Sequence, residues 1–391
     1  MPIGLFALAV SAFAIGTTEF VIVGLIPEMA RDLAVSIPTA GLLVSLYALA
    51  ITLGAPTVTA LTGRLPRRPL AIGLMAIFAG GNLIAAFAPG YGVLLAGRIV
   101  TGIAHGVFFS IGATVATSLV DKSRSSQAVS LMFAGLTVAM VIGVPFGTFV
   151  GQHFGWRAPF LAVAALGAIS VFGLRAWLPK TIPHTPPAGL LSQLSLLGRP
   201  RLLAMYLVTV FGFGGSFVVF TYLSPLMTGV THVGEATVSL ALMLFGVATV
   251  LGNLFGGRLA DRIGSEPALG IVLTGLILSL ATLPFTAGNV TGIFVNLFTW
   301  GVFAFAVSPI VQAGVVSTAE AEVPDAVGTA SGFNIAAFNL GIAGASFIGG
   351  ILVDGPGVLS TPWAAVALVV MALLIVGWLL RQRHSRPRTA C

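Results

Sequence analysis

Twelve long apolar segments limit what this chain can fold into more than any other feature of its sequence. About 20 apolar residues of helix cross the hydrocarbon core of a bilayer. We place such segments at 3–27, 39–62, 70–88, 91–119, 128–152, 158–178, 201–227, 235–257, 267–287, 290–318, 328–353 and 361–380. Only 7% of the 391 residues are charged, whereas a soluble domain carries roughly a quarter. We therefore expect an all-α integral membrane protein.

The segments fall into two sets of six, separated by a proline-rich stretch. Residues 179–200 hold four prolines within their first nine positions, and prolines remove helix donors, so the stretch reads as a linker. Its part at 190–197 could form a short helix on the membrane surface. We expect an N-terminal six-helix bundle at 1–178, a C-terminal six-helix bundle at 201–380 and a basic tail at 381–391.

A short sequence repeats between the two sets. The letters GRLPRR at 63–68 and GRLADR at 257–262 align without a gap at an offset of 194 residues. Each copy follows the second segment of its set. A duplicated six-helix unit is the plan of transporters whose two halves rock about a midplane site.

Basic residues lie almost entirely on one side of these segments. Of the 18 Lys and Arg, only Arg31 and Arg157 fall on the other side and Arg98 falls within a segment. The excess of basic loops marks the cytoplasmic face, so both termini are expected in the cytoplasm. The basic tail after Leu380 then reads as a topology anchor in contact with anionic lipid, and nucleic acid is not expected as a partner of this chain of net charge +7.

Four motifs resemble those of the major facilitator superfamily, in particular its twelve-helix drug:proton antiporters. They are GGRLADRIG at 256–264, LAGRIVTG at 95–102, GVPFGT at 143–148 followed by GWR at 155–157, and GTTEF at 16–20 followed by GLIP at 24–27. The opening motif looks most like the branch of arabinose and other sugar exporters, purine nucleoside exporters and chloramphenicol exporters. The first copy of the loop motif departs from the family pattern at Arg67, where an acid is usual, and this favours Asp261 as the conformational latch.

The resemblance implies a role for the loop and span-five motifs in the conformational change. The residues to which we assign this role are Gly63, Arg64, Arg68, Gly143, Pro145, Gly147, Gly257, Asp261 and Arg262. Small residues also recur every four positions at 135–151, 337–349 and 248–256. Such stripes permit close helix packing. They could in addition let the halves slide, and Pro145 locally weakens the helix.

Glu19 is the one carboxylate expected deep within the membrane, and buried acids there are costly and commonly functional. At 1.5 Å per residue, Glu19 and Arg98 both lie roughly 10–12 Å below the outer ends of their helices. If spans one and four are neighbours, as the family implies, the two could pair. The pair could couple protonation to transport, or it could hold two helices together.

His105 lies seven residues after Arg98 and hence on nearly the same helix face. Imidazole titrates near neutral pH, which suits a proton relay, while a packing histidine is an equal alternative. No second ligand lies at helical spacing from it, so we expect no metal site. Our expected proton-coupling residues are Glu19, Arg98 and His105.

Aromatic and amide side chains mark the expected substrate pocket. Most phenylalanines in a membrane helix are packing residues, but an indole or an amide at depth needs a polar partner. The residues that we expect to bind substrate are Thr18, Phe20, Tyr47, Thr101, Phe217, Phe220, Asn296, Trp300, Asn334 and Asn339. The second set offers no carboxylate that corresponds to Glu19, so the pocket should be apolar and sparsely charged.

These features predict a secondary active transporter that exports small neutral or weakly polar amphiphiles by proton antiport in a prokaryotic inner membrane. We expect no cofactor, because the proton gradient drives transport, and we expect a monomer. A proton-coupled importer of sugars or nucleosides is the nearest alternative, and the span-five motif speaks against it. A membrane enzyme would need clustered catalytic groups, whereas the five histidines and eleven acids are scattered. A receptor without transport stays open.

Overall fold

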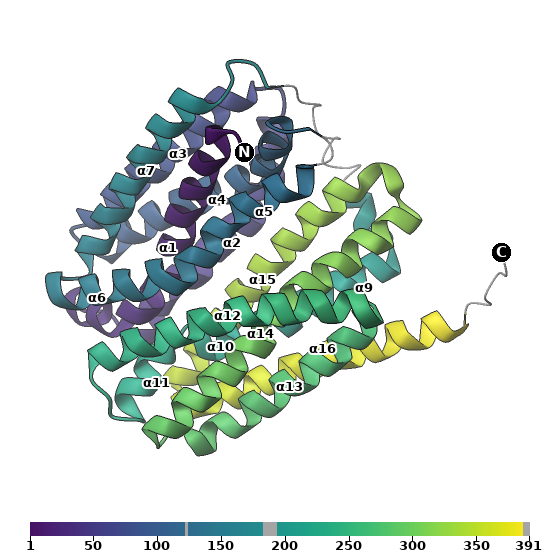
Figure 1. Cartoon of the computed structure of the whole chain (residues 1–391). Helices are drawn as coiled ribbons and strands as arrows, with labels where there is room; N and C mark the ends of the chain where they lie inside the picture. Colours follow the sequence, from purple (N-terminus) through teal and green to yellow (C-terminus); the bar gives the residue numbers. More distant parts are fainter. Residues whose placement is uncertain (122–123, 183–193, 386–391) are drawn as a thin grey trace. The chain divides into compact units, whose positions relative to one another are not determined.

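The computed structural model of the chain describes residues 1–121, 124–182 and 194–385, and in these residues it contains helices and no strand (Figure 1). Twelve helical segments of the described chain are long and apolar enough to cross a membrane. This confirms the expected all-α, twelve-span architecture. The chain is a multi-pass membrane protein.

Contacts between Cα atoms divide the chain into two units. The first contains Met1–Leu190 and Thr221–Val247, and the second contains Leu191–Phe220 and Ala248–Cys391. This division differs from the two six-helix halves expected from the sequence, since it places 221–247 with the first unit. The halves therefore remain a prediction, and the two units are described separately below.

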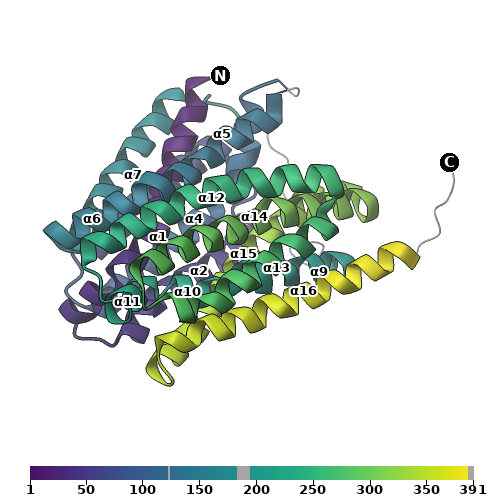
Figure 2. The same cartoon turned by 60° about the horizontal axis from the view of Figure 1, so that its bottom comes forward.

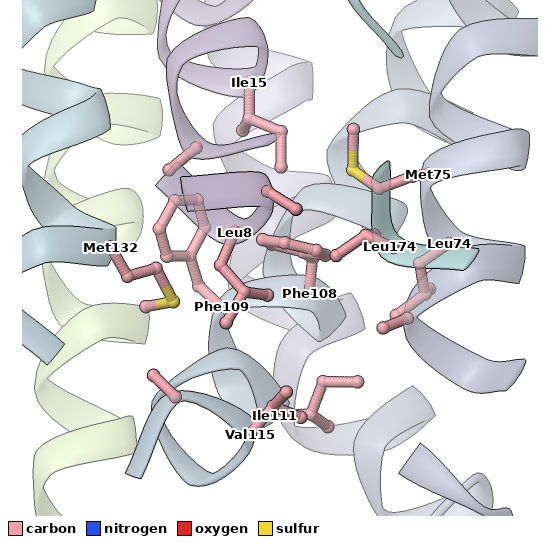
Figure 3. Close-up of a cluster of buried hydrophobic side chains, with 14 of the residues drawn as sticks. Leu8, Ile15, Leu74, Met75, Phe108, Phe109, Ile111, Val115, Met132 and Leu174 are labelled. Carbon is pink, nitrogen blue, oxygen red and sulfur yellow. The ribbon is translucent and has the colours of Figure 1, made fainter. Parts of the chain in front are cut away.

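Helices of the first unit pack in a bundle around a hydrophobic core. Its helical segments are α1 (Ile3–Asp32), α2 (Ile37–Leu61), α3 (Arg67–Ala86), α4 (Tyr91–Ser118), α5 (Ser125–Val138), the π-helical η2 (Ala139–Gly143), α6 (Val144–Phe154), α7 (Arg157–Trp177), α11 (Leu223–Gly229) and the first part of α12 (Glu235–Ile263). The main pairings join α2 with α4, α3 with α4 and α7, and α1 with α5 and α7. Figure 3 shows the core, where Leu8, Phe108 and Met132 meet from three helices and are no more than 1% exposed.

The second unit is built around the pairings of α13 with α14 and α16, which run side by side in Figures 1 and 2. Its segments are the 3₁₀ turn η3 (Ser195–Gly198), α9 (Pro200–Val208), the π-helical η4 (Thr209–Phe213), α10 (Phe217–Phe220), the rest of α12, α13 (Ser265–Thr286), α14 (Val290–Glu322), η5 (Pro324–Ala326), α15 (Val327–Asp354), η6 (Val358–Ser360) and α16 (Thr361–Ser385).

Two spans that the sequence predicts as uninterrupted helices contain a π-helical turn. In span five, η2 separates α5 from α6. Pro145 lacks the N–H that an α-helix would donate to the carbonyl of Val141, which favours the wider turn just before it. In span seven, η4 follows α9, and the span then continues through α10 and α11. Pro225 cannot donate to the carbonyl of Thr221, which fits the break between α10 and α11; no proline accounts for η4 itself.

The small-residue stripe of span five lies against α1, so the expected close packing is present. A Cβ atom built on each of its glycines would meet α1 at 3.2 Å or less. The contacts run in order along both helices: Gly135 with Phe13, Gly143 with Thr17, Gly147 with Val21, and Gly151 with Leu25. These glycines therefore fix the distance between the two helices.

The two copies of the repeated loop sequence fold differently. In the first copy, α2 ends at Leu61 and α3 begins at Arg67, so residues 63–66 form a turn. In the second copy α12 continues to Ile263, so the prediction of a loop at 257–262 is wrong. The physical reason is residue 66: proline there blocks a continuous helix, whereas the corresponding residue of the second copy is Ala260. Helix α12 is instead ended by Gly264, at a φ of 86° that suits glycine.

Other boundaries also differ from the expected ones. Helix α16 continues to Ser385, past the expected end at 380, and residues 386–391 of the expected basic tail lie outside the described residues. Of the expected surface helix at 190–197, the first four residues lie outside the described residues, and the remainder enters η3.

Candidate functional site

Glu19 lies in the middle of α1, within the interior of the first unit. Its exposed fraction is 8%. The three ion pairs of the described chain lie near helix ends, at Arg31–Glu235, Asp32–Arg157 and Arg201–Glu266. Among the described residues Glu19 thus has no basic partner within 4.0 Å, Arg98 included. A direct Glu19–Arg98 ion pair is not the arrangement in this structure.

Arg98 of α4 instead faces the backbone of the residue before Glu19. Its Nη1 donates a 2.8 Å hydrogen bond to the carbonyl oxygen of Thr18, and the side chain is buried. Its guanidinium carbon lies 3.8 Å from the centroid of the Tyr47 ring, a cation–π contact. Within the described chain, Nε and Nη2 have no hydrogen-bond partner. These two N–H groups can donate hydrogen bonds to an anionic or polar group that comes within reach.

His105 and Tyr47 extend this cluster along α4 and α2. The Tyr47 hydroxyl and His105 Nδ1 are 3.0 Å apart, and both side chains are buried. The direction of this hydrogen bond depends on the imidazole tautomer. Tyr47 of α2 therefore contacts both Arg98 and His105, the two residues of α4 that their seven-residue spacing placed on nearly the same helix face.

Asn82 of α3 completes the cluster, and the sequence analysis missed it. Its Oδ1 accepts a 2.7 Å hydrogen bond from the Thr18 hydroxyl, and its Nδ2 donates to the carbonyl of Phe78. Asn82 is 1% exposed and Thr18 is fully buried. Residue 18 is thus held from α3 through its side chain and from α4 through its carbonyl. Asn82 could have been found from the sequence, because it is an amide within an apolar span. The same argument did identify Asn296 and Asn334.

We name the residues Thr18, Glu19, Tyr47, Asn82, Arg98 and His105 the polar cluster. Thr101 borders it, but its hydroxyl donates to the carbonyls of Gly97 and Arg98 within its own helix. Thr18 likewise uses its hydroxyl on Asn82. Phe20 is 8% exposed and buried in α1. In this structure, therefore, the hydroxyls of Thr18 and Thr101 serve packing within the first unit.

Replacing Asn82 by Leu is expected to lower the free energy of unfolding by about 1–3 kcal/mol, because the buried Thr18 hydroxyl loses its acceptor. Replacing both partners by apolar residues removes the unsatisfied group. The double variant Thr18→Val, Asn82→Leu should therefore cost less than the sum of the two single changes. Reversible unfolding in mixed micelles measures all three. Additive costs would show that the hydrogen bond carries no coupling energy.

The second unit brings three of the expected substrate residues together. The ring centroids of Phe217 and Phe220 lie 5.4 Å apart, and those of Phe220 and Trp300 lie 6.3 Å apart, both in edge-on arrangements. Trp300 is fully buried, and both phenylalanines are 2% exposed. Phe213 extends the row through Phe217. We name these four residues the aromatic row; their rings pack against one another in the interior of the second unit.

The three expected asparagines lie in different surroundings. Asn334 of α15 accepts from the Thr209 hydroxyl and donates to Gln312 Oε1, so it ties η4, α14 and α15 together. Asn296 of α14 donates to Ser279 and Thr282 of α13. The buried Oδ1 atoms of Asn296 and Asn339 have no hydrogen-bond partner in the described chain. These two oxygens could accept hydrogen bonds from a ligand, whereas the Asn334 amide is already occupied.

The conformational motifs lie near helix ends and where η2 and α6 pack against α1. Arg64, Asp261 and Arg262 are exposed, while Arg68 donates a 2.6 Å hydrogen bond to the carbonyl of Arg175. Among the described residues Asp261 forms no ion pair within 4.0 Å, so its role as a latch stays a prediction. Among the described residues, no three His, Cys, Asp or Glu side chains lie where they could together hold a metal ion.

Comparisons with known proteins agree on one family. The sequence profile of the Major Facilitator Superfamily matches residues 8–323 and 227–390. The chain is 42% identical to an Escherichia coli inner membrane transport protein, YdhP, over 99% of this chain and 97% of that protein. It is 34% identical to a chloramphenicol resistance protein of Streptomyces lividans, with 96% and 95% covered. It is 31% identical to a probable sugar efflux transporter of Mannheimia succiniciproducens, with 94% and 91% covered.

A solved structure shares the fold at low sequence identity. It is a bacterial homologue of the human lysosomal transporter Spinster, in an inward-facing and occupied conformation. The TM-score is 0.77 at 16% identity, with 98% of this chain and 96% of that chain covered. This likeness concerns the fold alone.

Proposed function

Because this chain belongs to the major facilitator superfamily of transporters, we propose that it is a secondary active transporter that exports small neutral or weakly polar amphiphiles by proton antiport. The relatives named for chloramphenicol resistance and for sugar efflux support this direction and this range of compounds. The one-sided distribution of basic residues supports an inner membrane location with both termini in the cytoplasm.

The observation that carries the proposal is Glu19. It is a carboxylate in mid-span, 8% exposed, with no ion-pair partner in the described chain. Ionisable groups at this depth commonly form proton relays in pumps and transporters. A carboxyl group that is not held in a fixed ion pair is free to change its protonation as its surroundings change.

The neighbours of Glu19 suit the proton-coupling role. Arg98 fixes the backbone of Thr18 and keeps two donors unused, so its charge stays close to α1 without neutralising the acid. Movement of α1 relative to α4 would change the distance between these charges, and with it the affinity of Glu19 for a proton. His105, hydrogen-bonded to Tyr47, offers a second proton-binding group along α4.

The aromatic row of the second unit suits the substrate that we propose. Phe217, Phe220 and Trp300 provide apolar and π surfaces, and the carbonyl oxygens of Asn296 and Asn339 provide acceptors without charge. Neutral phenicols, sugars and nucleosides carry hydroxyl or amide donors that match such acceptors. Substrate and protons are the only small partners that the proposal requires, and it involves no cofactor.

Everted membrane vesicles test this function. Respiration acidifies the vesicle lumen, and a fluorescent pH probe reports the gradient. Adding chloramphenicol or arabinose to the outside should make the lumen more alkaline, since an antiporter exchanges luminal protons for substrate. A symporter would instead carry protons in with the substrate and acidify the lumen. No response to either compound class, together with no uptake of labelled substrate, would refute export of such compounds.

A further inference from the structure

A groove on the second unit runs between α12 and α14 and ends at two arginines. It has a volume of about 500 Å³. The groove is lined from α12 by Leu251, Leu254, Phe255, Arg258, Leu259 and Arg262, and from α14 by Phe298 and Val302. The spacings of three and four residues place the α12 members on one helix face. The groove is thus apolar over most of its length and basic at one end.

The backbones of the two helices are in close contact beside this groove. A Cβ built on Gly256 would lie 2.8 Å from Ala306 Cα, and one built on Gly252 would meet Val302 backbone atoms. Real Cβ atoms do not approach so closely, so α12 and α14 touch where these glycines lie. The groove is therefore a fixed feature of the helix pair.

Its length and polarity fit one leaflet of a bilayer. Leu251 and Arg262 are eleven residues apart, which is about 16 Å along a helix and close to half of a ~30 Å hydrocarbon core. Leu254 and Phe255 are exposed in the apolar part, whereas Arg258 and Arg262 are exposed at the end of α12. The distribution of basic loops puts this end at the cytoplasmic surface.

We propose that this groove binds a phospholipid with an anionic headgroup in the cytoplasmic leaflet. An acyl chain lies along Leu254, Phe255 and Phe298, and Arg258 and Arg262 bind the headgroup phosphates. Arginine presents a planar fork of donors that matches phosphate oxygens. Basic pockets between membrane helices on this side are suited to anionic headgroups.

Asp261 is the one acidic side chain that accompanies the two arginines on this turn of α12, and it is exposed. The three charges together leave one net positive charge, which complements phosphatidylglycerol or cardiolipin. A zwitterionic headgroup could place its amine near Asp261 instead, so the experiment must separate these lipids.

Native mass spectrometry of the full chain, with equal amounts of phosphatidylglycerol, phosphatidylethanolamine and phosphatidylcholine, tests the site. We expect at least about tenfold preferential retention of phosphatidylglycerol over both other lipids. The double variant Arg258→Gln, Arg262→Gln should lose this preference. Arg64→Gln is the matched control, because Arg64 is exposed and corresponds to Arg258 at the 194-residue offset. It should keep the preference.

A second variant keeps the proposal testable if the double variant does not fold. Leu254 lines the groove and is 50% exposed, so Leu254→Trp fills the groove while keeping both arginines. It should also lose retention of phosphatidylglycerol. Equal retention of all three lipids by the unmodified protein, or unchanged preference in both groove variants, would overturn the proposal. Preference for phosphatidylethanolamine would overturn it as well.

Discussion

The substitution Glu19→Gln is expected to abolish proton coupling and leave a folded transporter. Glutamine keeps the size of the side chain and can make hydrogen bonds, but it cannot bind or release a proton at accessible pH. A neutral amide also costs less than a carboxylate in an apolar interior. We therefore expect uphill, gradient-driven export to fall at least about tenfold, a change of ~1.4 kcal/mol, while the thermal midpoint stays the same or rises.

Two transport assays distinguish coupling from general damage. Substrate-induced proton movement in proteoliposomes should disappear in Glu19→Gln, whereas exchange of labelled for unlabelled substrate without a pH gradient should continue. Glu28→Gln is the matched control, since Glu28 is a half-buried carboxylate near the C-terminal end of the same helix. It should retain coupling. Normal proton release by Glu19→Gln would assign coupling to another group, with His105 the next candidate.

Replacing Gly341 by Leu should prevent stable folding of the second unit. A Cβ on Gly341 of α15 would lie 2.6 Å from the carbonyl oxygen of Val210 and 2.9 Å from Gly214 Cα. Both obstacles are backbone atoms, which cannot move aside as a flexible side chain can. Overpacking commonly costs about 1–3 kcal/mol and more where backbones must separate. We expect a loss of monodisperse protein in size-exclusion chromatography, or a thermal midpoint lowered by several degrees.

Gly344 provides the matched control on the same helix. A Cβ there meets nothing within 4 Å, and the residue is exposed. Leu at 344 should leave the elution profile and the thermal midpoint unchanged, because the added side chain has open space around it. Equal behaviour of the two variants, whether both stable or both unstable, would show that the α15 contact at Gly341 does not decide stability.

The number and length of the spans could be predicted because hydrophobic thickness sets them. Each apolar run needed only to be long enough, and the twelve runs correspond to the twelve helical segments. The internal interruptions could not be predicted in this way. Residues 139–143 read as Ala-Met-Val-Ile-Gly, which is as apolar as an ordinary span; Pro145 indicates a weakened helix there but does not specify a π turn.

The sequence could predict how far along their helices the residues of the candidate site lie, but not which neighbours their side chains would face. Counting residues along α1 and α4 correctly brought Glu19 and Arg98 to similar levels, and the structure joins Arg98 to the residue beside Glu19. Counting cannot give the rotation of a side chain about its helix. Arg98 turns to the Thr18 carbonyl and the Tyr47 ring, and that choice depends on how three helices pack. Asn82, by contrast, was open to the amide argument and was overlooked.

The π turn at 139–143 changes which face of span five the residues after it occupy. A four-residue repeat on an α-helix advances by about 40° at each step, so four steps from 135 to 151 would rotate the stripe by about 160° and away from α1. One extra residue in a wide turn removes about 100° of that rotation. A substitution scan along the span would therefore show two helical wheels, offset by about 100° at residues 139–143. Deleting one residue there would turn Gly147 and Gly151 off the α1 face without changing their neighbours in the sequence.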